Sequence, residues 1–71
     1  MNITVTNKND EVLGVGDEVE FKGQDSYFKG TIVSIFTKLD GKSVRCVVQD
    51  ERGLLLIKLP SSAILIKNES V

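Results

Sequence analysis

The sequence predicts a small all-β domain, and three observations support this fold class. Short runs rich in Val, Ile, Leu and Thr recur over residues 31–59, and such runs favour strands. Turn signals separate the runs, at Asp40-Gly41 and again at Gly53. No segment shows the apolar spacing of a long helix. We therefore expect five short strands that close into one barrel over residues 12–67.

Two strands are expected in the first half of this barrel. A Gly-x-Gly-Asp turn precedes the strand over 18–22, in which Val19 and Phe21 alternate with charged residues and share one face. The second strand is expected over 31–37. Gly30 stands just before it, and a glycine at a strand start suggests a bend or the close approach of another backbone.

Three more strands are expected in the second half, over 43–49, 54–59 and 64–67. Alternation places Cys46 on the same face as Val44 and Val48, so we interpret it as a small core residue. Pro60 ends the fourth strand because it has no amide hydrogen to donate. Residues 60–63 have the right length for a single helical turn.

The helical turn before the last strand favours an SH3-like barrel. A five-stranded oligonucleotide-binding barrel is the alternative, but it usually needs a longer chain and a helix between its third and fourth strands. Residues 1–11 are expected to form a flexible N-terminal segment, in which 3–6 is either a short strand or part of a tail. Residues 68–71 are expected to form a C-terminal tail.

Composition limits the chemistry that this chain is expected to perform. Its 71 residues include no histidine and one cysteine, Cys46, so neither an intrachain disulfide nor a structural zinc site is expected. We expect no catalytic residues, no cofactor and no metal, and hence no enzyme. The chain shows no secretory signal and no long apolar stretch, so the expected location is cytoplasmic, without a membrane partner.

Several short motifs resemble those of a known family. These motifs are Gly16-Asp17-x-Val19, Gly30-x-Ile32-Val33, Val47-Val48 and Pro60 followed by Ala63-Ile64. They resemble the SH3-like barrel of the plasmid-borne type II dihydrofolate reductases. That family carries a Val-Gln-Ile-Tyr segment that lines a tetramer pore and holds folate and nicotinamide. Residues 54–59 lack the glutamine and the tyrosine, so the resemblance does not imply reductase activity, and a pore enzyme of that type is kept only as a third alternative.

A second resemblance covers residues 45–57. The motif is Arg45-x-Val47-Val48-x-Asp50-x-Arg52-Gly53-Leu54-Leu55-x-Ile57. It is similar to small uncharacterised SH3-like proteins of bacteriophages, prophages and other mobile elements. This resemblance implies a fold and an origin but no activity.

The function expected first is protein binding by an apolar sheet face. Strand alternation separates a core set, which includes Ile32, Phe36, Val44, Val48, Leu55 and Ile57, from an opposite set. The opposite set either wraps around the same core on bent strands or forms a partner-binding face, and the residues expected in that face are Val33, Ile35, Arg45, Val47, Gln49, Leu54, Leu56 and Lys58. Because a 71-residue domain without disulfide or metal gains from burying more surface, we expect a homo-oligomer, with a host or phage protein as a further possible partner.

Nucleic-acid binding is the main alternative function. Small barrels can bind nucleic acids through a basic face that carries aromatic side chains. The candidate residues are Tyr27, Lys29, Lys38, Lys42, Arg45 and Arg52. Phe28 and Phe36 are expected in the core. The sequence pI of 5.2 lies far below that of a typical nucleic-acid-binding domain, which makes protein binding the preferred prediction.

Overall fold

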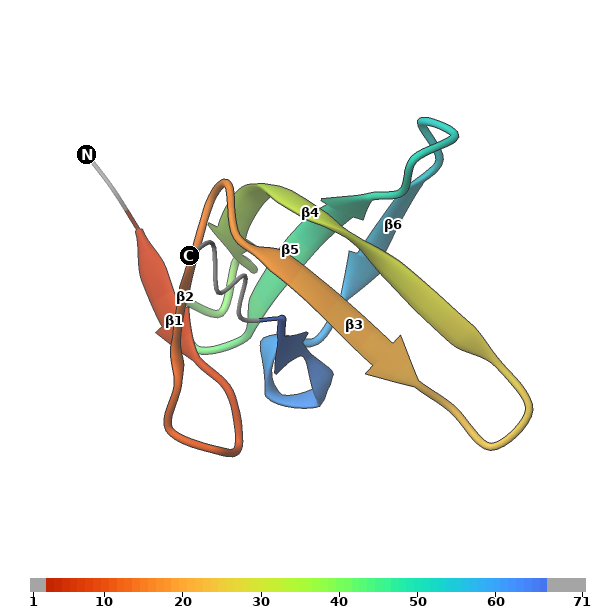
Figure 1. The fold of residues 1–71 in the computed structure, drawn as a ribbon. Coiled ribbons are helices and arrows are strands. Elements are labelled where there is room, and N and C mark those ends of the chain that lie inside the picture. The colour runs from red at the N-terminus through yellow and green to blue at the C-terminus, as the bar shows by residue number, and fades with distance from the viewer. Residues whose placement is uncertain (1–2, 67–71) are drawn as a thin grey trace.

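The computed structural model describes residues 3–66, which form two antiparallel sheets and one 3₁₀ turn (Figure 1). The elements are β1 (Thr4–Thr6), β2 (Val12–Gly14), β3 (Glu18–Lys22), β4 (Tyr27–Thr37), β5 (Val44–Gln49), β6 (Leu55–Lys58), η1 (Pro60–Ser62) and β7 (Ile64–Leu65). The larger sheet has the order β6-β5-β4-β3-β7, and β1 pairs with β2 in the smaller one. The predicted all-β class is confirmed. The expected tail at 68–71, like residues 1–2 and 67, lies outside the described residues.

All five expected strands are present in the larger sheet, and β4 is longer than predicted. Its first part pairs with β3, where Phe21 lies opposite Phe28, and its last part pairs with β5. Gly30 lies near the crossing of the two hairpins. A Cβ atom built there would collide with the carbonyl oxygen of Gln49 and lie 2.8 Å from Cγ1 of Val48. The predicted close backbone approach at Gly30 is therefore confirmed.

A β-bulge between Ile32 and Ser34 changes the expected faces of β4. The extra residue, Val33, shifts the alternation, so that Ile32 and Ile35 both point into the core. The prediction that Ile35 belongs to an outward partner-binding face is wrong, because this side chain is buried. The prediction that Phe36 is a core residue is also wrong, because 37% of its surface is exposed.

The hairpin between β4 and β5 occurs where Asp40-Gly41 predicted it. The loop closes through two backbone hydrogen bonds, from Lys38 N–H to Ser43 O and from Gly41 N–H to Lys38 O. Gly41 adopts a φ of 70°, which favours glycine. The Asp40 carboxylate accepts hydrogen bonds from Lys42 N–H and Ser43 N–H, and these bonds lower its pKa.

The turn between β5 and β6 inverts the faces predicted for β6. Asp50 N–H donates to Leu54 O and Gly53 N–H donates to Asp50 O, so Gly53, at a φ of 89°, is an extra residue inside the turn. Leu56 therefore pairs with the buried Val48 and points inward with it. A one-residue shift of this kind moves every side chain of a strand to the other face.

The predicted outward positions of Leu56 and Lys58 are thus wrong, and so are the predicted core positions of Leu55 and Ile57. Leu56 and Lys58 are half-buried, whereas Leu55 is 55% exposed and Ile57 is 64% exposed. Leu59, which directly follows β6, is also exposed.

The N-terminal segment contributes a strand and core contacts. Thr4–Thr6 pairs with Val12–Gly14, which settles the alternative left open for residues 3–6. Asn7 is buried, and its Nδ2 donates to Ala63 O at 3.0 Å while its Oδ1 accepts from Glu11 N–H. Where a flexible segment was expected over 1–11, residues 3–11 thus form a strand and a turn that Asn7 ties to the far end of the chain.

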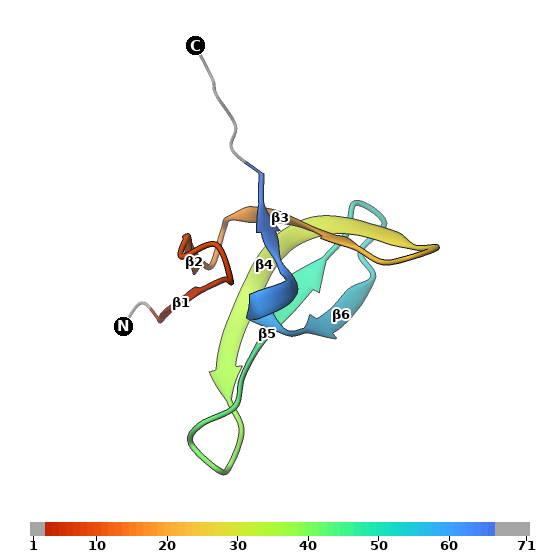
Figure 2. The same cartoon turned by 90° about the horizontal axis from the view of Figure 1, so that it is seen from below.

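The core lies between the two sheets and the 3₁₀ turn. It consists of Leu13, Val19, Phe21, Ile32, Ile35, Cys46, Val48 and Ala63, with Val5, Phe28, Val44 and Leu65 packed against it. The core position predicted for Cys46 is confirmed, and Val19 and Phe21, which were predicted to share one face, both lie in the core. In Figure 2, η1 lies beside β5 and β6 and leads directly into β7.

Candidate interaction surface

The outward side of β4, β5 and β6 carries an exposed apolar cluster. Ser34 pairs with Val47 and Val47 with Ile57, so these three side chains form one row across the sheet. Phe36 pairs with Arg45 in the row on one side, and Gln49 pairs with Leu55 in the row on the other. We call the set Phe36, Arg45, Val47, Leu55 and Ile57 the outward face. Neighbouring apolar side chains on adjacent strands can be buried by one partner.

The β6 strand is an edge of the larger sheet, and β5 is its only partner among the described strands. Outside the β5–β6 ladder, the backbone groups of Leu55 and Ile57 take part in no hydrogen bond with another described residue. An edge strand with large exposed apolar side chains can pair with another chain. Proteins often protect such an edge with charges or proline, and residues 54–57 contain neither.

The structure brings together only part of the predicted partner-binding set. Arg45, Val47 and Gln49 lie on the side of β5 opposite the core, as predicted, and Leu54 is exposed at the start of β6. Val33 is exposed but lines a separate hollow with Ile3, Val12 and Val15. Ile35, Leu56 and Lys58 point inward instead.

The prediction missed Phe36, Leu55 and Ile57 as surface residues. The signal that could have found the last two is the Asp-x-x-Gly sequence of the β5–β6 turn. A type I turn followed by glycine in the left-handed region makes a three-residue loop, which fixes the register observed here.

The Lys58 side chain packs against the protein's own aromatic residues and is not presented to a partner. Its Nζ lies 5.6 Å from the ring centroid of Phe21 and 5.7 Å from that of Phe28. The two rings are themselves 6.3 Å apart. An ammonium group over aromatic faces is stabilised by the negative ring quadrupole. Lys58 thus covers the aromatic end of the core from the side of β6.

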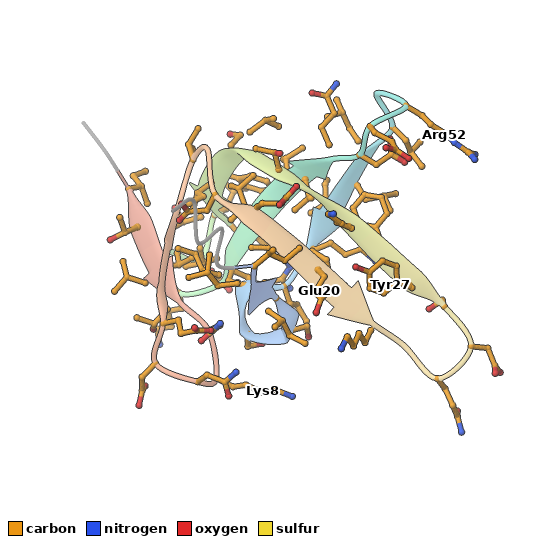
Figure 3. The ribbon with its side chains drawn as sticks, viewed as in Figure 1. Lys8, Glu20, Tyr27 and Arg52 are labelled. Atoms are coloured by element: carbon orange, nitrogen blue, oxygen red, sulfur yellow. The ribbon has the colours of Figure 1, made fainter. Side chains whose placement is uncertain are left out.

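The residues proposed for nucleic-acid binding fall into separate regions. Tyr27, Lys29 and Arg52 line one groove, between the first part of β4 and the β5–β6 turn. Figure 3 shows Arg52 projecting from that turn into solvent. The groove is also lined by three acids, Glu18, Asp50 and Glu51. These acids oppose the binding of a phosphate backbone.

The remaining basic candidates lie elsewhere. Lys38 and Lys42 are in the β4–β5 loop, at the other end of β4 from Tyr27. Arg45 lies on the outward face, where its Nη1 donates to the carbonyl oxygen of Val44 at 3.0 Å. The structure therefore does not gather the six candidates into one basic face.

Tyr27 and Glu20 form a hydrogen-bonded pair beside the groove. The Tyr27 hydroxyl donates to the Glu20 carboxylate at 2.7 Å, and the two side chains point toward each other in Figure 3. This bond, together with the charge of Lys22, lowers the pKa of Glu20 below 4.5. The same bond raises the pKa of the Tyr27 hydroxyl above 10.0. The Tyr27 hydroxyl is thus held by a carboxylate, whose negative charge adds to that of the three acids in the groove.

We expect Tyr27→Phe to raise the pKa of Glu20 toward 4.5, because the substitution removes the hydrogen bond to the charged carboxylate. The pair contributes stability above the unfolded pKa of Glu20, and this contribution is lost as pH falls through the lower folded pKa. The stability that the Tyr27 hydroxyl contributes is lost at alkaline pH, as pH rises through the raised pKa of this hydroxyl and it loses the proton that it donates. NMR titration of the Glu20 carboxyl in the wild type and the variant measures the shift. An unchanged Glu20 titration in the variant would contradict the pairing.

The described residues offer little for catalysis. Cys46 is buried, and burial raises the pKa of its thiol, which disfavours the reactive thiolate. No group of three or more acids or Cys within residues 3–66 is arranged to hold a metal ion. None of the described elements is a helix long and apolar enough to cross a membrane.

Comparisons of the chain with models of protein families, with curated proteins and with solved structures found no match.

Proposed function

We propose that this chain is a non-enzymatic interaction module with an SH3-like barrel fold, and that it binds itself through the outward face. Several features support the barrel: the strand order β6-β5-β4-β3-β7, the single 3₁₀ turn between β6 and β7, and the pairing of β7 with β3. The origin in phages or other mobile elements, which the resemblance of residues 45–57 implies, remains a prediction. So does a role in binding a host or phage protein.

One observation carries the proposed function: Leu55 and Ile57 are both more than half exposed on an edge strand beside Val47. Single exposed apolar residues are normal on protein surfaces, but a cluster of them marks an interaction site. Burying one leucine or isoleucine contributes roughly 1.5–3 kcal/mol. Four such residues, two from each copy, would contribute roughly 6–12 kcal/mol against an association cost of about 4–15 kcal/mol, so they supply a large part of the free energy that a dimer needs.

We expect Ile57→Asp to abolish self-association while the chain stays folded, because the aspartate is exposed in the monomer but unpaired in an apolar interface. Sedimentation velocity from about 10 to 500 μM measures the oligomeric state. Leu39→Asp is the matched control, since Leu39 is fully exposed in the β4–β5 loop, away from the outward face. It should associate like the wild type. A wild type that stays monomeric over the whole range would end the proposal of self-association.

Nucleic-acid binding is kept as the second candidate, because Tyr27, Lys29 and Arg52 do line one groove. Its mark would be binding of random DNA or RNA that weakens steeply as salt rises. The three acids in the same groove make us expect no binding tighter than about 100 μM at 150 mM salt, in the non-specific range. Titration of labelled single-stranded DNA at 50 and 200 mM salt tests this. Submicromolar, salt-sensitive binding that Lys29→Glu removes would reverse our order of preference.

Enzymatic activity is not part of the proposal. The type II dihydrofolate reductase alternative needs polar side chains along residues 54–59, where the structure has exposed Leu55 and Ile57. The only thiol in the chain, that of Cys46, lies in the core.

A further inference from the structure

We propose that two copies of this chain associate by pairing their β6 strands antiparallel, about a two-fold axis at Leu56. This inference rests on the proposed function and names both the mode of contact and the partner, a second copy. The pairing would join the two larger sheets into one continuous sheet of ten strands. Three features of β6 support this pairing: the direction of its free backbone groups, the order of its side chains and its charges.

The hydrogen bonds of the β5–β6 hairpin determine which backbone groups of β6 are free. In an antiparallel ladder, bonded and non-bonded residue pairs alternate. Because Asp50 N–H donates to Leu54 O, the next bonded pairs are Val48 with Leu56 and then Cys46 with Lys58. Leu55 and Ile57 fall between them. Their N–H and C=O groups therefore point away from β5, toward the open edge.

These free groups match those of a second copy only in certain registers. When Leu56 lies opposite Leu56 of the second copy, Leu55 lies opposite Ile57 on both sides of the axis. Each of these two pairs exchanges two N–H···O=C bonds, which gives four bonds in total. A shift by one residue would place free groups opposite groups that already bond to β5, and the bonds would be lost.

The side chains fit the same axis. On the outward side, each Ile57 would lie beside Leu55 of the other copy. Each of the two resulting rows would run from Val47 and Ile57 of one copy through Leu55 to Gln49 of the other. The two exposed side chains that carry the proposed function would thus contact each other across the junction of the two sheets. A strand whose apolar residues lie symmetrically about its centre can form the same contact twice in a dimer.

The charge on β6 does not oppose the pairing. Lys58 is its only charged residue, and its Nζ lies over Phe21 and Phe28 on the inward side. In the proposed register, Lys58 would face Leu54 of the second copy rather than another Lys58. No like charges therefore meet across the axis.

Two other free edges of the larger sheet suit a second copy less well. β7 is only two residues long, and both are half-buried. The first part of β4 has no β5 partner before Thr31, but it borders the groove that contains Glu18, Asp50 and Glu51. Two copies joined there would bring these acids together.

Disulfide trapping tests the position of the axis. Non-bonded antiparallel pairs have Cα atoms about 4.5 Å apart, which lies within the range that a disulfide spans. Leu56→Cys should therefore form a covalent dimer when oxidised glutathione is added to the folded protein at a concentration where the wild type associates. Leu54→Cys is the matched control. In the proposed register its two thiols would lie about 13 Å apart along the strand, so it should not cross-link. The wild-type protein, treated in the same way, shows whether Cys46 itself forms a disulfide under these conditions.

A backbone substitution tests the pairing independently of cysteine chemistry. Leu55→Pro removes the N–H that points to the open edge and leaves the bonds to β5 in place, and proline is tolerated in edge strands for this reason. Leu55→Thr has a similar loss of apolar surface but keeps the N–H. We expect the proline variant to dimerise at least tenfold more weakly than the threonine variant by sedimentation, with melting curves showing that both are folded.

The outcomes distinguish self-association as such from association through paired β6 strands. Selective cross-linking of Leu56→Cys, together with the weaker dimer of Leu55→Pro, supports the β6 pairing. If the wild type dimerises but neither result appears, the β6 pairing is wrong and the outward face must associate in another way. If Leu54→Cys cross-links instead, the axis is misplaced. A monomeric wild type overturns the pairing and the proposed self-association together.

Discussion

Gly30→Ala should lower the free energy of unfolding by about 3 kcal/mol, the upper end for overpacking a well-packed site. The added Cβ would collide with the carbonyl oxygen of Gln49 and approach Cγ1 of Val48. A backbone carbonyl held in the β4–β5 ladder cannot move aside without breaking that ladder. Because a domain of this size has only about 3–5 kcal/mol of stability, the variant should keep at most about 2 kcal/mol at 25 °C.

Urea denaturation followed by circular dichroism measures this loss. Gly14→Ala is the matched control, since its added Cβ would meet Cγ2 of Thr4 at 3.6 Å, an ordinary contact distance. It should change stability by less than about 1 kcal/mol. If the two variants are equally stable, the close approach at Gly30 is wrong.

Leu13→Ala should cost about 2–5 kcal/mol, the range for deleting a buried leucine side chain. Leu13 is 0% exposed and belongs to β2, which pairs with β1. The large cost follows from its position in the same core as Val19 and Ile32. This substitution therefore asks whether the N-terminal hairpin is part of the cooperative unit.

Val12→Ala is the control for the second prediction, because Val12 is exposed on the same strand. It should stay within about 0.5 kcal/mol of the wild type. Should Leu13→Ala prove as stable as Val12→Ala, residues 3–14 would have to be a separate appendage rather than a wall of the core.

Alternation alone was enough to predict the regular strands. In β3, strict alternation of apolar and charged residues placed Val19 and Phe21 in the core, and in β5 it placed Cys46 and Val48 there. Asp40-Gly41 located the first hairpin because few other dipeptides suit such a loop. These features are local, so a single stretch of sequence contains all the information that they need.

Two single-residue insertions account for the main errors. Val33 bulges from β4 and turns Ile35 inward, and Gly53 extends the β5–β6 turn and turns Leu55 and Ile57 outward. Each insertion reverses the faces of the residues that follow it. The composition of β4 and β6 does not show which face is buried, because both faces of these strands are apolar.

Other features depend on contacts between distant parts of the chain. Asn7 is part of a polar N-terminal sequence, and only its hydrogen bond to Ala63 O, 56 residues away, explains its burial. Lys58 likewise acquires its role from Phe21 and Phe28, which lie on two other strands. Neither contact has a signature in the local sequence.

Amide hydrogen exchange at Leu55 and Ile57 tests most directly whether the open edge of β6 is the interaction surface. By the alternation of bonded pairs, the two amides point away from β5 toward the open edge, so at low protein concentration they should exchange rapidly. At a concentration where the chain self-associates, both should slow by at least tenfold, roughly the effect of 1.4 kcal/mol of added protection. The amides of Leu56 and Lys58, which bond to β5, should be slow throughout. Exchange at Leu55 and Ile57 that stays rapid in the associated state would contradict the account.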